Sequence, residues 1–261
     1  MIGKCFVGNR WNLLEKYGYS PLKQGDMFLY LHEKSFTSGA HLNDFNNDPT
    51  PEMTIIDVLN NLEKTYTEPL VSMFNNHISM FQKHNTPEIQ RKIMIWANMI
   101  VNCIKNGHKV LIAGNGGSAA DAQHFAAELV VRFKKNRRGI PAIALTTDTS
   151  VLTAIANDFG MLHMFSRQIE AFGEQGDVFI AITTSGNSEN ILEAVETAKS
   201  NLLDVIVLTG KCGGEVKNLV APEEIFVVLD METARIQEFH EFILHAIAEM
   251  VENTFPETAV P

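Results

Sequence analysis

Apolar residues recur at intervals of three and four over residues 54–84 and again over residues 88–106. This spacing places them on one face of an α-helix, so each range predicts a long amphipathic helix. Pro69 predicts that the first range forms one kinked helix or two helices, and Gly107 stands where the second helix should end. The second apolar stripe consists of Ile89, Ile93, Trp96, Ile100 and Ile104. Such stripes either cover the chain's own sheet or pack against helices of another subunit.

From residue 109 onward, short apolar runs alternate with helical patterns. The runs lie at 110–113, 142–145, 178–182, 205–208 and 225–229. This alternation is typical of a doubly wound α/β fold, in which helices flank a mainly parallel, five-stranded sheet. Ligands of such folds bind beyond the carboxyl ends of the strands.

The first 52 residues differ from the rest of the chain. They are rich in Asn, Gly and aromatic residues, and 43–51 reads as a linker. We expect an N-terminal extension, 1–52, and a main domain, 53–261. Trp11 and Tyr17 belong to a segment too apolar for a purely disordered tail, so we expect it to pack on the main domain or on a partner. Met53 is a candidate for an alternative translation start.

Composition narrows the classes of function. The chain has 261 residues, of which 45% are hydrophobic, and a formal net charge of -10, which argues against nucleic acid as its partner. The basic run 132–138 is expected to be a solvated loop. No apolar run approaches the ~20 residues that cross a membrane, and the three cysteines show no pairing pattern. We therefore expect a cytoplasmic protein.

The segment 109–128 predicts a strand, a glycine loop and a helix. Gly114, Gly116 and Gly117 allow a ligand to approach the backbone closely, and Ser118 and the first helical amides can donate to an anion. His124 and Glu128 are four residues apart, so they share a face of that helix. The pattern favours a phosphorylated small molecule held next to acid/base or metal chemistry.

A second hydroxyl-rich loop supports this interpretation. Thr183, Thr184, Ser185 and Ser188 follow one apolar run and precede a helix that should begin near Glu189. Residues 114–119 also satisfy the dinucleotide pattern GxGxxA, but the acidic residue expected about 20 positions later is missing. A dinucleotide is therefore disfavoured.

The C-terminal helix carries a polar stripe of Gln237, Glu241 and His245 opposite an apolar one. We expect His240 and Glu241 to face solvent. His245 differs, because two imidazoles, a carboxylate and an amide can form a zinc-type site with the first helix. Gln237 and His245 are ~12 Å apart on a regular helix, so they meet one ion only at an irregular helix start or if two chains contribute.

Five motifs in unbroken order carry a resemblance to a known family. They are GNGGSAADAQHFAAEL (114–129), ANDFG (156–160), TTSGNS (183–188), LTGKCGG (208–214) and RIQEFHEFILH (235–245). The chain resembles the sugar isomerase (SIS) domain, specifically the phosphoheptose isomerases, from about residue 54 to 255. The resemblance implies a zinc-dependent homotetramer that converts sedoheptulose 7-phosphate to D-glycero-D-manno-heptose 7-phosphate, the first step toward nucleotide-activated heptose for surface polysaccharide.

The resemblance also implies the site residues. The substrate contacts are Asn115, Gly116, Gly117, Ser118, Glu128, Asn157, Asp158, Thr183, Thr184, Ser185, Ser188 and Gln237. The zinc-binding cluster, with one ion per subunit, is His124, Glu128, Gln237 and His245. Glu128 and His245 are implied as the proton-transfer pair. Thr183 stands where the family often has Ser, and Ala234 where it often has Asp.

Regulators of replication initiation that bind the initiator protein resemble the same motifs. They generally lack the carboxylate at the position of Glu128 and the histidine at the position of His245. This chain has both residues, which favours the enzyme over the binding module. Another sugar-phosphate isomerase is the second alternative.

Overall fold

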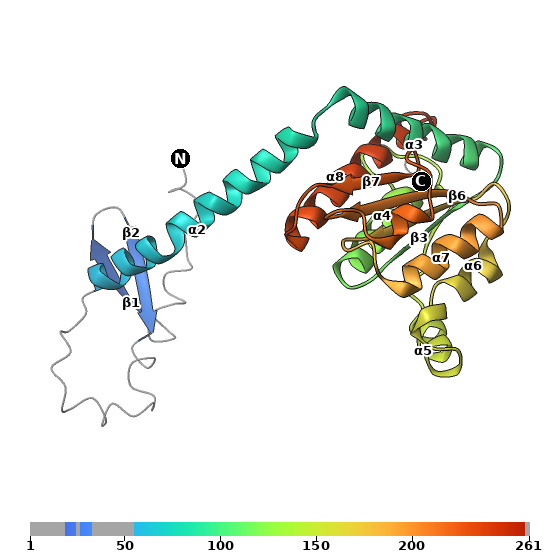
Figure 1. Ribbon diagram of the computed structural model, residues 1–261. Coiled ribbons are helices and arrows are strands. Elements are labelled where there is room, and N and C mark those ends of the chain that lie inside the picture. Colours follow the sequence, from blue (N-terminus) through green and yellow to red (C-terminus); the bar gives the residue numbers. More distant parts are fainter. Residues whose placement is uncertain (1–18, 25–26, 33–54, 259–261) are drawn as a thin grey trace. The chain divides into compact units, whose positions relative to one another are not determined.

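The computed structural model describes residues 19–24, 27–32 and 55–258, which belong to two compact units, 1–64 and 65–261 (Figure 1). The first unit contains an antiparallel pair of strands, β1 (Tyr19–Gln24) and β2 (Met27–His32), which pair from Tyr19 with His32 to Gln24 with Met27. The sequence analysis did not predict this hairpin. Trp11, Tyr17, the expected linker 43–51 and Met53 lie outside the described residues.

The second unit is built on the predicted five-stranded sheet. Its strands are β3 (Val110–Gly114), β4 (Ala142–Ala144), β5 (Val178–Thr183), β6 (Asp204–Gly210) and β7 (Ile225–Val228). All neighbouring strands are parallel, in the order β4-β3-β5-β6-β7. The chain first moves to one side of β3 and then to the other, so the direction of winding reverses between β3 and β5. Ligands of doubly wound sheets bind at this switch point.

Helices cover both faces of the sheet. The helices that follow α2 (Ile55–His84) along the chain and flank the sheet are α3 (Pro87–Lys105), α4 (Gly117–Val130), α5 (Thr149–Asp158), α6 (Ser166–Phe172), α7 (Glu189–Ser200) and α8 (Thr233–Glu252), with short 3-10 turns η3 (Met161–His163) and η4 (Glu215–Asn218). One apolar core contains Trp96 of α3, Phe125 of α4 and Phe239 of α8. The core on the other face contains Ile169 of α6 and Ile191 of α7. No helix in the described ranges is both long and apolar enough to cross a membrane.

The apolar stripes of α2 and α3 differ in how far they are buried. α2 runs through Pro69 as one helix, so of the two predicted alternatives the single helix forms. The stripe of α3 is buried at Ile93, Trp96 and Ile100, so it covers the chain's own sheet. Thr86 caps α3, and Gly107 follows its end with a φ of 87°, as expected.

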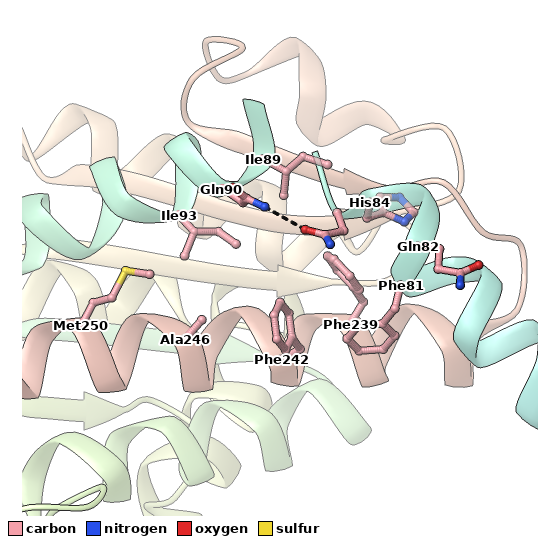
Figure 2. A pocket seen from close by; sticks show the side chains of 11 residues that line it. Phe81, Gln82, His84, Ile89, Gln90, Ile93, Phe239, Phe242, Ala246 and Met250 are labelled. Atoms are coloured by element: carbon pink, nitrogen blue, oxygen red, sulfur yellow. Dashed lines mark hydrogen bonds between the residues drawn. The ribbon is translucent and has the colours of Figure 1, made fainter. Parts of the chain in front are cut away.

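The stripe of α2 stays exposed over residues 66–78. Beside the end of this helix, the apolar side chains of Phe81, Phe242 and Met250 line a hollow of about 350 Å³ between α2, α3 and α8 (Figure 2). Apolar surface therefore continues from α2 onto α8.

A buried ion pair fastens the end of α8 to the segment after α4. The side chains of Arg137 and Glu252 are 1% and 2% exposed, with 3.3 Å between Nε and Oε1. The Glu252 carboxylate accepts hydrogen bonds from the backbone amides of residues 133, 134 and 135 at 2.7–2.9 Å. Arg137 donates to the carbonyl oxygens of Glu128 and Leu129 at 2.7 and 2.6 Å. The expectation of a solvated loop at 132–138 was wrong at Arg137.

The first prediction concerns this ion pair. Burial raises the pKa of Glu252, but the three amide donors and Arg137 outweigh burial and lower the pKa below its ordinary value. Glu252→Gln should lower the free energy of unfolding at neutral pH by about 3 kcal/mol, because Arg137 would be left buried without its counter-charge. Chemical denaturation measures this loss.

The stability that the Glu252 carboxylate contributes should depend on pH in a definite direction. A lowered folded-state pKa contributes stability at neutral pH that is lost as the pH falls through that pKa. The difference between the parent and Glu252→Gln should therefore shrink on the acid side. Glu249→Gln is the control, because its ion pair with Lys134 is exposed, and it should change stability by less than about 0.5 kcal/mol. An equal, pH-independent effect of both variants would contradict the argument.

Candidate active site

Three helices begin at one small pocket beyond the carboxyl ends of β3 and β5. Gly117 and Ser118 come from the start of α4, Ser188 caps α7, and Thr233 begins α8. Thr183 and Thr184 add hydroxyls from the end of β5, and the cavity measures about 250 Å³. None of the lining residues carries a charge. Helix dipoles, backbone amides and hydroxyls therefore favour an anion in this pocket, which is large enough for a phosphate group.

The hydroxyl-rich loop 183–188 is held in place by the backbone of residues 213–216, which approaches it closely. A Cβ atom on Gly186, whose φ is 71°, would meet the carbonyl oxygen of Gly213. The amides of Glu215 and Val216 donate to the Asn187 side chain and to the Gly186 carbonyl, at 2.8 and 3.0 Å. The end of the motif at 208–214 and the two residues after it thus support the hydroxyl-rich loop 183–188.

Asn115 has a partner that the sequence analysis missed. Its side-chain amide and that of Asn190 exchange two hydrogen bonds of 2.9 and 3.0 Å. Asn190 lies in the first turn of α7 and is buried. The pair fixes the start of α7 against the glycine loop, and no local pattern marks it.

Gln237 lies at this pocket rather than with the histidines. It is one of the lining residues, and its amide sits where a Cβ atom on Gly117 would be. The absence of a side chain at Gly117 is therefore what admits Gln237 to the pocket.

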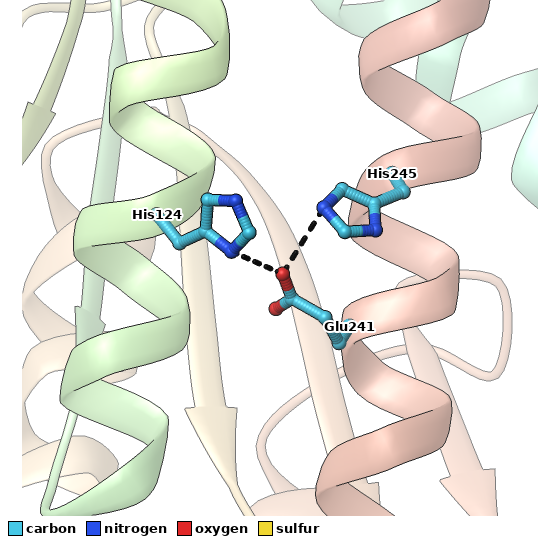
Figure 3. Close-up of side chains that lie close together, drawn as sticks. All are labelled: His124, Glu241 and His245. Carbon is cyan, nitrogen blue, oxygen red and sulfur yellow. Dashed lines mark ion pairs between the residues drawn. The ribbon is translucent and has the colours of Figure 1, made fainter. Parts of the chain in front are cut away.

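A second cluster lies farther along α4 and α8 (Figure 3). His124 contacts Glu128 on its own helix, with 3.0 Å between Nε2 and Oε1, and contacts Glu241 through Nδ1. His245 Nε2 lies 3.1 Å from Glu241 Oε1. The ligand atoms of His124, Glu241 and His245 all lie within 4.8 Å of one another. Two imidazoles and a carboxylate are a ligand set that suits zinc.

Asp121 extends the cluster toward the pocket. Burial, and then the charge of Glu241, raise the pKa of Asp121 to about 6, while His124 opposes the shift. Its Oδ2 atom is buried and has no hydrogen-bond partner within the described ranges. Asp121 was not singled out from the sequence.

Two residues on α8 depart from their expected surroundings. His240 is fully buried, its Nε2 lies 3.0 Å from the carbonyl oxygen of Thr209, and burial lowers its pKa to about 4. Glu241 is partly buried between the two imidazoles. The expectation that both face solvent was wrong, because α8 packs on β6 along one side and beside α4 along another.

Other predicted residues lie away from the pocket. Asn157 and Asp158 end α5, are exposed and bond to each other at 2.7 Å, so the motif at 156–160 begins as helix. The Ser185 hydroxyl accepts from the amide of Asn187. Gly116 precedes α4 with a φ of 57°. Asp148, the nearest acidic residue at a strand end after the glycine loop, caps α5.

Ala234, which replaces a carboxylate common in the family, is exposed in the first turn of α8. Its neighbour Arg235 still has an acidic partner, with 2.7 Å between Nη2 and Glu238 Oε1. Glu238 in turn contacts His77 of α2 at 2.7 Å. Orientation of Arg235 therefore does not require the missing carboxylate.

The anion pocket and the histidine cluster lie on the same two helices. His124 follows Gly117 by seven residues, or ~10 Å along α4, and Glu241 follows Gln237 by one turn of α8. A ligand anchored by an anionic group at the start of both helices can reach the imidazoles and carboxylates with its other end. The arrangement suits proton transfer on a phosphorylated small molecule.

Comparison with known proteins agrees with this geometry. Residues 73–210 match the SIS domain model. The phosphoheptose isomerase of Campylobacter concisus is 47% identical over 188 residues, which are 71% of this chain and 98% of that protein. The chain belongs to the phosphoheptose isomerase family. It is therefore an isomerase with an SIS fold.

Solved structures of the family show the same fold. The phosphoheptose isomerase of Neisseria gonorrhoeae is 40% identical, with a TM-score of 0.67 over 72% of this chain and 98% of that one. The Francisella tularensis protein is 37% identical, with a TM-score of 0.68 and the same coverage. The family relationship covers nearly the whole length of both relatives.

The second prediction concerns Gly117. Gly117→Ala should push the Gln237 amide out of the pocket and weaken binding of inorganic phosphate about tenfold, or ~1.4 kcal/mol. Titration calorimetry measures this affinity. In a Gln237→Ala background the same substitution should have little further effect, because the displaced group is gone. Equal losses in both backgrounds would show that Gly117 does not act through Gln237.

Proposed function

We propose that the chain interconverts sedoheptulose 7-phosphate and D-glycero-D-manno-heptose 7-phosphate, the step that supplies heptose for nucleotide activation and surface polysaccharide. One observation carries the proposal: an uncharged phosphate pocket and a cluster of two imidazoles and two carboxylates lie along the same pair of helices. The relatives of this chain are named for phosphoheptose isomerisation. A non-catalytic regulator would need the pocket but not the cluster.

Glu128 and His245 are proposed as the proton-transfer pair. Aldose-ketose isomerisation removes a proton from one carbon and returns it to the neighbouring carbon through an enediol, while a second group moves the hydroxyl proton. The side chains of Glu128 and His245 are 19% and 36% exposed, so both are shielded but open to a ligand. The Phe133 ring lies over the His245 ring, with 5.4 Å between centroids and 30° between planes. This stacking holds the His245 imidazole in one orientation.

Zinc is proposed as the cofactor, one ion per subunit. The imidazoles of His124 and His245 fit it, since their rings are 5.0 Å apart with a carboxylate between them. When bound, zinc supplies a positive charge that polarises a carbonyl and stabilises an enediolate.

The third prediction tests the reaction itself. Glu128→Gln should keep the fold and lower isomerisation by at least ~100-fold, because general acid/base groups commonly contribute 10²–10⁴ in rate. The measurement is proton NMR of sedoheptulose 7-phosphate in D₂O, which follows both the new sugar and deuterium uptake at carbon. Glu249→Gln, on an exposed part of α8, should retain the parent rate. A folded Glu128→Gln that works nearly as fast as the parent would remove Glu128 from the mechanism.

We also propose that the chain forms a homotetramer through α2. The side chains of Tyr66, Leu70 and Phe74 on this helix are 52–69% exposed. This exposed stripe continues into the apolar hollow beside Phe81 and Phe242. Contiguous exposed apolar surface of this kind marks a protein interface. Ile93, by contrast, belongs to the core of its own subunit.

The fourth prediction follows from this surface. Phe74→Glu should shift the protein toward smaller species, because burying an unpaired carboxylate in an interface costs several kcal/mol. Light scattering coupled to gel filtration measures the assembly. Asn75→Glu is the control, since Asn75 is an exposed polar neighbour on the same helix. A parent that is monomeric, or a Phe74→Glu variant that assembles as the parent does, would contradict the interface.

A further inference from the structure

The side-chain amides of Asn115 and Asn190 form a closed pair. Asn115 Nδ2 donates to Asn190 Oδ1 at 2.9 Å, and Asn190 Nδ2 donates back to Asn115 Oδ1 at 3.0 Å. Asn190 is only 9% exposed, so water competes little for its side of the pair. Hydrogen bonds shielded in this way are stronger than the same bonds in water, and breaking one leaves a polar group buried without a partner.

The pair connects the two loops that surround the proposed phosphate pocket. Asn115 belongs to the glycine loop 114–118 and lines the pocket. Asn190 lies in the first turn of α7, two residues after Ser188, which also lines the pocket. The two asparagines are 75 positions apart in the sequence. Among the described residues, no other side-chain hydrogen bond joins these two loops.

We infer that Asn190 is a positioning residue for phosphate binding, because it holds the glycine loop at a fixed separation from the hydroxyl-rich loop 183–188. Asn190 is not among the residues that line the pocket, so it acts through Asn115. This role rests on the proposed function, in which the pocket binds the phosphate group of the sugar. It adds a residue that family resemblance does not place among the substrate contacts.

An anion in this pocket draws its donors from both loops. Ser118 comes from the glycine loop, and Thr183 and Ser188 come from the hydroxyl-rich loop. Contacts within the second loop fix it internally, since the Thr183 hydroxyl accepts from the Gly186 amide at 3.2 Å and lies 3.4 Å from Ser188 Oγ. The asparagine pair instead fixes one loop against the other. Donors that are held in place before the ligand arrives avoid the loss of affinity that ordering a loop would cause.

Two amides suit this role better than a carboxylate would. A side-chain amide carries two N–H groups, and Asn190 takes only one of those of Asn115. The second N–H of Asn115 is therefore available to an anionic oxygen in the pocket. A carboxylate at position 190 would accept from Asn115 but would not donate back, and its negative charge would oppose a bound phosphate.

The test measures phosphate affinity and turnover in the full-length protein. Titration calorimetry with inorganic phosphate gives the affinity, and steady-state isomerisation of sedoheptulose 7-phosphate gives kcat and KM. The variants are Asn190→Ala, Asn115→Ala and the double variant, each checked for folding by circular dichroism. Val195→Ala is the matched control, because Val195 is a buried residue of α7 that packs in the core and does not line the pocket.

Asn190→Ala should weaken inorganic phosphate about tenfold, which is the size expected for a shielded hydrogen-bonded pair. KM should rise by a similar factor while kcat stays within about threefold, because the phosphate group binds equally in the ground state and the transition state. Asn115→Ala should lose at least as much affinity, and adding Asn190→Ala to it should cause little further loss. Val195→Ala should lower thermal stability but keep the parent affinity.

Four results would overturn the positioning role. They are a parent that does not bind inorganic phosphate, an unchanged phosphate affinity in Asn190→Ala, additive losses in the double variant, and an equal loss of affinity in Val195→Ala, which would reduce the pair to general support of α7. Failure of the proposed function looks different. Inorganic phosphate would bind and its affinity would depend on the pair, but sedoheptulose 7-phosphate would not be isomerised.

Discussion

The parallel sheet is the constraint on which the site depends. All five strands run in one direction, so each connecting helix that follows a strand begins at the same edge. Near the reversal between β3 and β5, the starts of α4, α7 and α8 therefore meet at one pocket. Each free helix terminus contributes unsatisfied amides and a partial positive charge. An anion site is thus a direct consequence of strand direction and winding order.

Because α4 and α8 pack side by side, the remaining residues of the site lie one after another along these two helices. Gly117 and Gln237 lie at the pocket where both helices begin, and His124, Glu241 and His245 lie farther along. The ion pair of Arg137 and Glu252 joins the far ends of the same two helices. Because Arg137 also binds the carbonyl oxygen of Glu128, the carboxylate proposed as the base has its backbone fixed by a buried contact.

Local patterns in the sequence predict what depends on local structure. The strands, the helix starts near Gly117 and Glu189, and the role of Gly107 follow from periodicity and turn chemistry. Helical periodicity shows that Glu241 and His245 share a face, but it does not show that α4 covers that face. Glu241 was therefore assigned to solvent. The i, i+4 pairing of Glu241 with His245, which mirrors that of His124 with Glu128, was the available signal.

Arg137 is a second position that local sequence patterns do not predict. A run of five basic residues within 132–138 has the composition of a solvated loop, and only a carboxylate more than 100 residues away makes burial of one of them favourable. Asn190 belongs to the same class, since its partner Asn115 lies on another loop. Contacts between distant segments decide these positions, and single-helix patterns contain no information about them.

The pocket proposed to bind phosphate has no lysine or arginine among its lining residues. A phosphate group is the same in both sugars of an isomerisation, so any affinity for it stabilises substrate and product equally. A fixed cation would strengthen both complexes and slow the departure of either sugar. Directed amide and hydroxyl donors instead select the tetrahedral shape of the anion and release it readily. The uncharged pocket therefore favours turnover in both directions over tight retention of either sugar.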